Sequence, residues 1–281
     1  MPLLAVVVVL GCGGRAASTA PAPSPSPVPP PSPPLYSSLN GYVYDTAFRP
    51  VGGATVSLLD GAQGGASTQS NESGRFAFTG TFADPTSMRV SKDGYAAAIG
   101  TAKAPYPSAS PIWAFVVLDE LARPVDITGD FTLTIVADAG CSAIPGEPRT
   151  RTWDAAIRPA PDSRSQPGTS LTLTVSGSFL PDHGSFAIGV AGDDVAFSIY
   201  QGEDFGLVEK TAPGTFLATQ GMATISIGPG PVTKISTPFT GVIDYCALQA
   251  DARWTYECNS APRSAYQRCS STQHQLIVSR R

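Results

Sequence analysis

The sequence predicts an all-β protein: a small β-sandwich followed by a meander β-barrel, with a second β-sandwich as the alternative to the barrel. Glycine and proline contribute 28 and 27 of the 281 residues, and short runs rich in threonine, serine and valine recur between them. Such runs, broken by turn-forming residues, are typical of many short strands. With 42% hydrophobic and 14% charged residues, the chain can form two modest cores.

The charge balance argues against nucleic acid as a partner. The formal net charge is −4 and the isoelectric point is about 5.1. Binding to a phosphate backbone requires clustered lysine and arginine side chains. We therefore expect no nucleic-acid partner.

An apolar run and a cysteine open the chain. Residues 3–10 are apolar, too few to cross a bilayer but enough for the core of a signal peptide. The sequence Val9-Leu10-Gly11-Cys12 resembles the bacterial lipobox, in which the cysteine is lipidated and becomes the new N-terminus. The resemblance implies that residues 1–11 are a signal peptide and that Cys12 is the lipid anchor. The alternatives are ordinary secretory cleavage near Ser18-Thr19-Ala20 and a fragment of a membrane helix.

Proline dominates residues 21–34. Such a segment adopts extended polyproline II and, at roughly 3 Å per residue, spans about 40 Å. We interpret residues 12–35 as a lipidated proline-rich linker attached to the membrane by its lipid; a ligand for a proline-recognising domain is the alternative. By the lipoprotein resemblance, Gly13 after the cysteine favours sorting to the outer membrane, so we expect an exported, outer-membrane-anchored lipoprotein facing the periplasm or the cell surface.

Residues 36–120 read as one compact β-module. Two short runs rich in β-forming residues, 42–44 and 55–58, are separated by a turn that contains proline and glycine. Further turns end in glycine, and the apolar run 112–118 supplies a last strand.

The turn glycines and strand residues of this module follow a specific order. They are Gly41, Asp45, Pro50-Val51, Gly53-Ala54-Thr55-Val56, Ser73-Gly74-Arg75-Phe76 and Gly94-Tyr95. This order resembles the carboxypeptidase regulatory-like family. The resemblance implies a prealbumin-like β-sandwich, classed with carbohydrate-binding-like folds and often appended to secreted or surface proteins. It implies no catalytic residues, and structural roles for Gly41, Gly53, Gly74 and Gly94.

Residues 124–281 read as about nine consecutive strands. Apolar residues alternate strictly with threonine or serine in 131–135, 171–175 and 223–227, and 186–199 reads as a hairpin. Sequential hairpins make an up-and-down barrel or a sandwich. We favour the barrel, whose architecture is similar to lipocalin- and avidin-like meanders. Such a barrel encloses side chains or one small ligand.

Four cysteines occur in this second domain: Cys141, Cys246, Cys258 and Cys269. Because an exported chain meets an oxidising compartment, we expect two disulfides. We favour the pairs Cys141–Cys246, joining two strand ends, and Cys258–Cys269, closing a short loop, while the two other pairings stay open. There is no Cys-x-x-Cys pair, so we expect no metal site.

The sequence has no nucleophile elbow, phosphate loop or metal motif, so we expect a protein that is not an enzyme and needs no cofactor. Asp182 lies beside His183, which does not make a catalytic triad, and His274 has no assigned role. The acidic pairs Asp193-Asp194 and Glu203-Asp204 lie in or near loops, where weak calcium binding is the alternative to a solvated turn.

The tryptophans are the candidates for sugar stacking. Trp113 and Trp153 lie inside strand patterns, which favours the core. Trp254 and Tyr256 alternate onto one face beside the cysteine loop, so they are the candidate exposed platform for ligand binding.

Two function classes follow. The favoured one is a non-enzymatic cell-envelope lipoprotein whose β-modules bind carbohydrate or another envelope protein. The alternative is a lipocalin-like carrier that holds a small apolar ligand in the C-terminal barrel. A role as an enzyme accessory or inhibitor is a third, weaker hypothesis.

Overall fold

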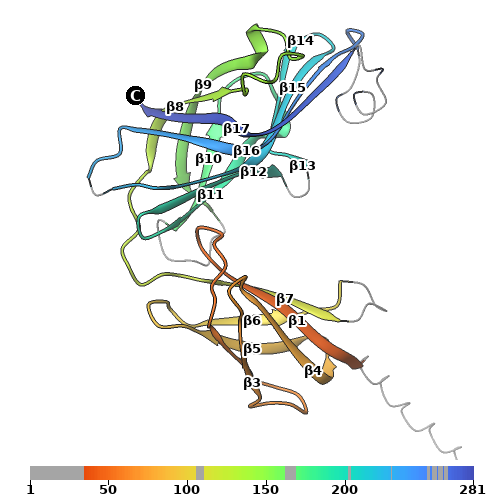
Figure 1. The fold of residues 1–281 in the computed structure, drawn as a ribbon, viewed down its shortest axis with the longest axis vertical. Coiled ribbons are helices and arrows are strands. Elements are labelled where there is room, and N and C mark those ends of the chain that lie inside the picture. Colours follow the sequence, from red (N-terminus) through yellow and green to blue (C-terminus); the bar gives the residue numbers. More distant parts are fainter. Residues whose placement is uncertain are drawn as a thin grey trace, which may run out of the picture. The chain divides into compact units, whose positions relative to one another are not determined.

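The computed structural model describes residues 35–105, 111–161, 169–201, 204–228, 230–251 and 265–281, together with Trp254, Cys258 and Pro262 (Figure 1). The predicted signal peptide, the Cys12 anchor and residues 12–34 of the predicted linker lie outside these residues, as do Glu203 and Tyr256. Residues from Pro34 to Arg281 form one compact unit. It is built almost entirely of strands, which confirms the all-β fold class.

The N-terminal part is a β-sandwich of two sheets. The first has the order β4–β1–β7 and consists of β1 (Leu35–Asp45), β4 (Arg75–Ala83) and β7 (Ile112–Leu118). The second has the order β3–β2–β5–β6 and consists of β2 (Thr55–Leu58), β3 (Ser67–Gln69), β5 (Thr86–Ser91) and β6 (Ala98–Ala102). Strand β1 pairs antiparallel with β4 and parallel with β7. The predicted sandwich is confirmed.

The core of the sandwich comes from strand alternation. Leu39 and Val43 of β1 are fully buried, as is Ile112 of β7, and they pack with residues of the second sheet. Gly41 lies between the two β1 residues, close to the ring of Phe76 and to a backbone carbonyl of β7. The central strand therefore tolerates no side chain at position 41.

The C-terminal part is a closed barrel of eight strands. The strands are β8 (Gly129–Val136), β9 (Thr150–Pro159), β10 (Ser170–Val175), β11 (Phe179–Ala191), β12 (Asp194–Gln201), β15 (Thr215–Ser226), β16 (Lys234–Ala247) and β17 (Tyr266–Arg280). Each pairs antiparallel with the next, and β17 returns to β8. The predicted meander barrel is confirmed, and the alternative of a second sandwich is wrong.

Two short strands and one helical turn decorate the barrel. Strands β13 (Asp204–Phe205) and β14 (Leu207–Ala212) form an excursion between β12 and β15, and β14 pairs with both β11 and β15. The 3-10 turn η1 (Glu147–Arg149) precedes β9. Among the described residues, no helix has the length and apolar character needed to cross a bilayer.

Buried apolar side chains fill the interior of the barrel. Fully buried examples from opposite parts of the wall are Leu133, Phe197, Phe239 and Leu276. Trp153 of β9 belongs to the same core, with its ring 5.6 Å from that of Phe179, as the sequence predicted. The interior positions follow the period of two that the sequence shows, because one face of each strand lines the barrel.

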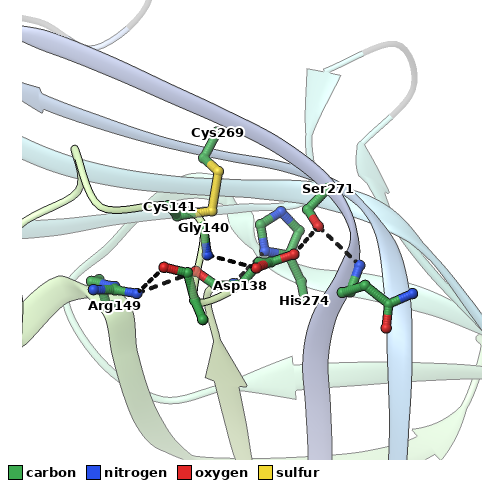
Figure 2. Close-up of a disulfide and its surroundings, with 9 residues drawn as sticks. Asp138, Gly140, Cys141, Arg149, Cys269, Ser271 and His274 are labelled. Carbon is green, nitrogen blue, oxygen red and sulfur yellow. Dashed lines mark hydrogen bonds between the residues drawn. A yellow bond between two sulfur atoms is a disulfide. The ribbon is translucent and has the colours of Figure 1, made fainter.

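Two disulfides form, but not with the favoured pairing. Cys141 bonds to Cys269, and Cys246 bonds to Cys258. The pairing follows from the positions of Cys246 and Cys269, which lie on opposite faces of the β16–β17 strand pair. Cys269 lies opposite Ile243, which points into the barrel, whereas Cys246 is three residues further along and points outwards. The inward cysteine therefore meets Cys141 of the β8–β9 loop, as Figure 2 shows.

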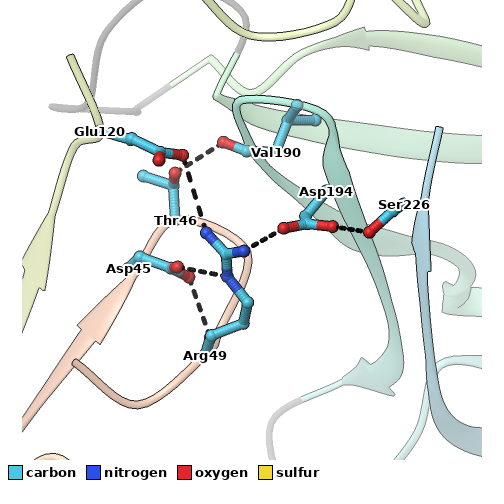
Figure 3. Close-up of polar contacts among 7 residues, drawn as sticks. All are labelled: Asp45, Thr46, Arg49, Glu120, Val190, Asp194 and Ser226. Atoms are coloured by element: carbon cyan, nitrogen blue, oxygen red, sulfur yellow. Dashed lines mark hydrogen bonds and ion pairs between the residues drawn. The ribbon is translucent and has the colours of Figure 1, made fainter. Parts of the chain in front are cut away.

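Polar contacts join the sandwich to the barrel (Figure 3). The Thr46 hydroxyl donates a hydrogen bond of 2.6 Å to the carbonyl oxygen of Val190 at the end of β11. Arg49 forms ion pairs with Asp45, Glu120 and Asp194, so one guanidinium links the sandwich to the β11–β12 turn. Because Asp45 is almost completely buried, we interpret this cluster as a structural joint.

Candidate functional site

The outer face of the β4–β1–β7 sheet carries a group of aromatic side chains. On β1, Tyr42 and Tyr44 alternate with the buried Val43, and on β7, Trp113 and Phe115 alternate with buried residues. Because successive side chains of a strand point to opposite faces, all four rings leave the sheet on the side away from the core.

The parallel register of β1 and β7 brings these rings together. Tyr42 lies opposite Phe115, and Tyr44 lies opposite Val117. The ring of Tyr42 is central: its centroid lies 6.0 Å from that of Trp113, 5.8 Å from that of Phe115 and 5.9 Å from that of Tyr44. The three interplanar angles are 9°, 14° and 21°, so the rings are close to parallel.

Much of this surface is exposed to solvent. Phe115 is 68% exposed and Val117 is 47% exposed, while Tyr42, Tyr44 and Trp113 are half-buried. Isolated exposed apolar side chains are common, but a contiguous apolar patch on a soluble protein marks an interaction surface. We call these five residues the aromatic face and take them as the candidate functional site.

Sequence reasoning missed this site. The run from Ile112 to Leu118 is entirely apolar, so it reads as a strand buried on both faces, and Trp113 was predicted in the core. The structure instead places Trp113 on the outer face, half-buried against Tyr42. One signal in the sequence could have found it. Tyr42 and Tyr44 are two positions apart, as are Trp113 and Phe115, so each pair projects from one face of its strand.

The predicted aromatic platform at Trp254 is wrong. The indole is 8% exposed and packs against Phe205 and Phe216, with ring centroids 5.5 and 6.0 Å away. It covers apolar residues on the outer side of β14 and β15. Burial of these outward-facing apolar residues removes them from water, and the Cys246–Cys258 disulfide belongs to the same apolar cluster. Tyr256 lies outside the described residues.

A serine, a histidine and an aspartate meet at one end of the barrel, but they are not connected as a catalytic triad (Figure 2). The Ser271 hydroxyl donates to the Asp138 carboxylate rather than to His274. The backbone N–H of Asp138 donates to His274 Nδ1 at 3.0 Å, and the imidazole is fully buried. These bonds tie the β8–β9 loop to β17, beside the Cys141–Cys269 disulfide.

We expect this buried histidine to make the protein sensitive to acid. Burial lowers the pKa of His274 below its ordinary value of 6.5. As the pH falls, the imidazole is therefore protonated in the unfolded chain before it is protonated in the folded protein. The contribution of neutral His274 to the free energy of unfolding is complete above about pH 6.5 and is lost as the pH falls through the folded-state pKa. Urea unfolding at a series of pH values should show a steeper loss of stability in the wild type than in His274→Gln. Parallel curves for the two proteins would contradict this role.

Two of the other predicted polar candidates, His183 and Asp194, make structural contacts. His183 Nδ1 lies 2.7 Å from the carbonyl oxygen of Phe205. Asp194 contacts Arg49 and the Ser226 hydroxyl beside a hollow of about 240 Å³. Three carboxylates share that one guanidinium, so the hollow offers no free cation for a ligand. Within the part of the chain that the structure describes, no group of three acidic, histidine or cysteine residues is arranged to hold a metal ion.

Comparison with known proteins identifies one part of the chain. A search of curated proteins gave no match. The lipoprotein resemblance and the likeness to lipocalins or avidins therefore stay predictions. The part that is identified is residues 38–106. It contains Tyr42 and Tyr44, whereas β7 with Trp113 and Phe115 lies beyond it. Residues 38–106 match the family model of the carboxypeptidase regulatory-like domain, which agrees with the resemblance seen in the sequence.

Proposed function

We propose that this protein is a non-enzymatic binding protein of the cell envelope whose sandwich binds carbohydrate through the aromatic face. The observation that carries the proposal is the set of nearly parallel rings around Tyr42, with Phe115 largely in solvent. The faces of aromatic rings carry negative charge density. The C–H groups on one side of a sugar ring carry partial positive charge, so sugar rings stack on such faces while their hydroxyls stay hydrated.

The position of the rings suits a polymer. They lie on the outer side of β1, the central strand of its sheet, and of the adjacent strand β7, and so form a broad surface. A surface of this kind accepts an extended chain from either side, whereas a small molecule is normally held in a concave pocket. Asn40 lies opposite Trp113 on the same face and adds an amide that can hydrogen-bond to a hydroxyl.

The remaining parts of the proposal rest on the sequence. A lipid at Cys12 and the proline-rich linker would hold the sandwich away from an outer membrane, where it could reach a polysaccharide. The alternative partner on this surface is another envelope protein. The fold of the carboxypeptidase regulatory-like domain suggests a non-catalytic module, which supports a binding role.

The carrier hypothesis for the barrel stays a prediction. The closed meander is compatible with it, but the interior is occupied by buried side chains such as Phe131 and Phe197. Native mass spectrometry of the purified protein tests it: a co-purified small molecule would support a carrier, and a mass equal to that of the chain alone would count against it.

The test of the proposed function is polysaccharide binding by variants of the aromatic face. We expect Tyr42→Ala and Phe115→Ala each to weaken binding about fivefold, because each removes a stacking ring worth roughly 1 kcal/mol. Isothermal titration and affinity electrophoresis against a broad panel of soluble polysaccharides measure this loss.

Ile99→Ala is the matched control. Ile99 is 66% exposed, close to Phe115 in exposure, but lies on β6 in the other sheet. We expect this variant to bind like the wild type. Two results would overturn the proposal: a wild-type protein that binds nothing in the panel, or a Phe115→Ala variant that binds as tightly as the wild type while keeping its thermal stability.

A further inference from the structure

We infer that the carbohydrate bound at the aromatic face is an acidic polysaccharide, an inference that rests on the proposed function. It comes from the charges around the face. Arg75 of β4 lies directly opposite Tyr42, and Lys103, just after β6, lies directly opposite Trp113. Residues opposite each other in an antiparallel pair project to the same side, so both cations border the aromatic face.

The two cations lie at opposite edges of the face. Across the sheet the order is Arg75 on β4, then β1, then β7, then Lys103. Three inter-strand steps of about 4.8 Å, with an offset of two residues along β7, place their backbones about 16 Å apart. This separation is wider than one sugar ring. A ligand that contacts both cations while stacking on Tyr42 must therefore be an oligosaccharide or a longer chain.

No described residue neutralises either cation. Both residues are exposed, and within the described residues neither forms an ion pair. Five other arginines of the described chain, in contrast, pair with carboxylates. These are Arg49, Arg151, Arg158, Arg268 and Arg281.

The face itself carries no negative charge. The register of the three strands places ten residues on the outer side of the β4–β1–β7 sheet, and they include the aromatic face. They are Ser38, Asn40, Tyr42, Tyr44, Arg75, Ala77, Thr79, Trp113, Phe115 and Val117. None of them is acidic. An acidic sugar chain would therefore stack on the rings with its carboxylates or sulfates near the two edges, without a like charge beneath it.

Each cation suits such a group in its own way. The guanidinium of Arg75 can donate two parallel hydrogen bonds to a carboxylate or sulfate, and the ammonium of Lys103 acts as a point charge. The formal net charge of −4 opposes an anionic ligand at long range. The preference must therefore come from short-range contacts at the face, and salt will weaken it.

The experiment compares one polymer with and without its charge. Polygalacturonate and its methyl ester share a backbone, but only the first carries carboxylates. By affinity electrophoresis at about 50 mM salt, we expect the full chain to prefer polygalacturonate about tenfold, and we expect the preference to shrink at about 500 mM salt. The double variant Arg75→Gln and Lys103→Gln should lose the preference but retain binding to the ester.

Arg89→Gln is the matched control, because Arg89 is an exposed cation on β5 of the other sheet. It should behave like the wild type; an equal loss would mean that net charge alone matters, and would overturn the inference. Equal binding of both polymers, or binding of neutral polysaccharides only, would also overturn it and leave the proposed function standing. Binding of no polysaccharide at all would remove the proposed function, and this inference with it.

Discussion

Replacing Cys141 and Cys269 together by serine is expected to lower the free energy of unfolding by about 5 kcal/mol. This disulfide joins residues 128 positions apart, and cross-linking a long loop restricts the unfolded chain more than cross-linking a short one. It also fastens the β8–β9 loop to β17 at the end of the barrel, where Arg149 donates hydrogen bonds to carbonyl oxygens of the same loop. Urea unfolding under oxidising conditions measures the difference.

The second disulfide supplies the control. Cys246 and Cys258 are only 12 positions apart, so their double serine variant should lose about 3 kcal/mol, less than the first. Hydrogen exchange should then show faster exchange in the β8–β9 loop for the first variant only. The reverse order of stabilities, or peptide mapping under non-reducing conditions that joins Cys141 to Cys246, would contradict the assignment.

Replacing Gly41 by alanine is expected to destabilise the protein by about 3 kcal/mol. A Cβ atom at this position would lie 2.6 Å from the carbonyl oxygen of Ala114 and closer still to the ring of Phe76. The ring could turn away, but the carbonyl belongs to β7, which pairs with β1 throughout its length. Relief of the clash would therefore separate two strands of the sheet that carries the aromatic face.

Gly146→Ala is the comparison variant, because a Cβ atom there meets nothing within 4 Å and the backbone is already right-handed helical. It should change the stability by less than about 0.5 kcal/mol. Thermal and urea unfolding of both variants give the comparison. Equal stability of Gly41→Ala and the wild type would show that β1 and β7 are not packed as described.

Local patterns were enough to predict most of the strands, although β6 and β14 were not among them. The alternation in residues 131–135 and 223–227 recurs in β8 and β15 as inward apolar and outward polar side chains. The order of glycines around Gly41 and Gly74 likewise identified the sandwich, because positions of close approach or tight turning exclude other residues. These features depend on neighbours a few residues away, so one sequence contains them.

The errors concern which face of a strand meets which partner. Trp254 was predicted to be exposed, yet it covers apolar residues on the outside of β15. Trp113 was predicted to be buried in the core, yet it lies half-buried on the outer face of its sheet, away from the sandwich core. Periodicity shows that a strand has two faces, but not which of them another segment will cover, because that segment comes from far along the chain.

The sequence by itself therefore determined the all-β class, most of the strands, the resemblance of the sandwich to the carboxypeptidase regulatory-like domain and the presence of two disulfides. Only the tertiary structure decided that the second domain closes into a barrel, because closure requires β8 and β17 to pair across the whole domain. It also decided the pairing of Cys141 with Cys269 and the parallel register that brings the rings of Trp113 and Phe115 beside Tyr42. Each of these is a long-range contact, set by how complete sheets pack rather than by any local run of residues.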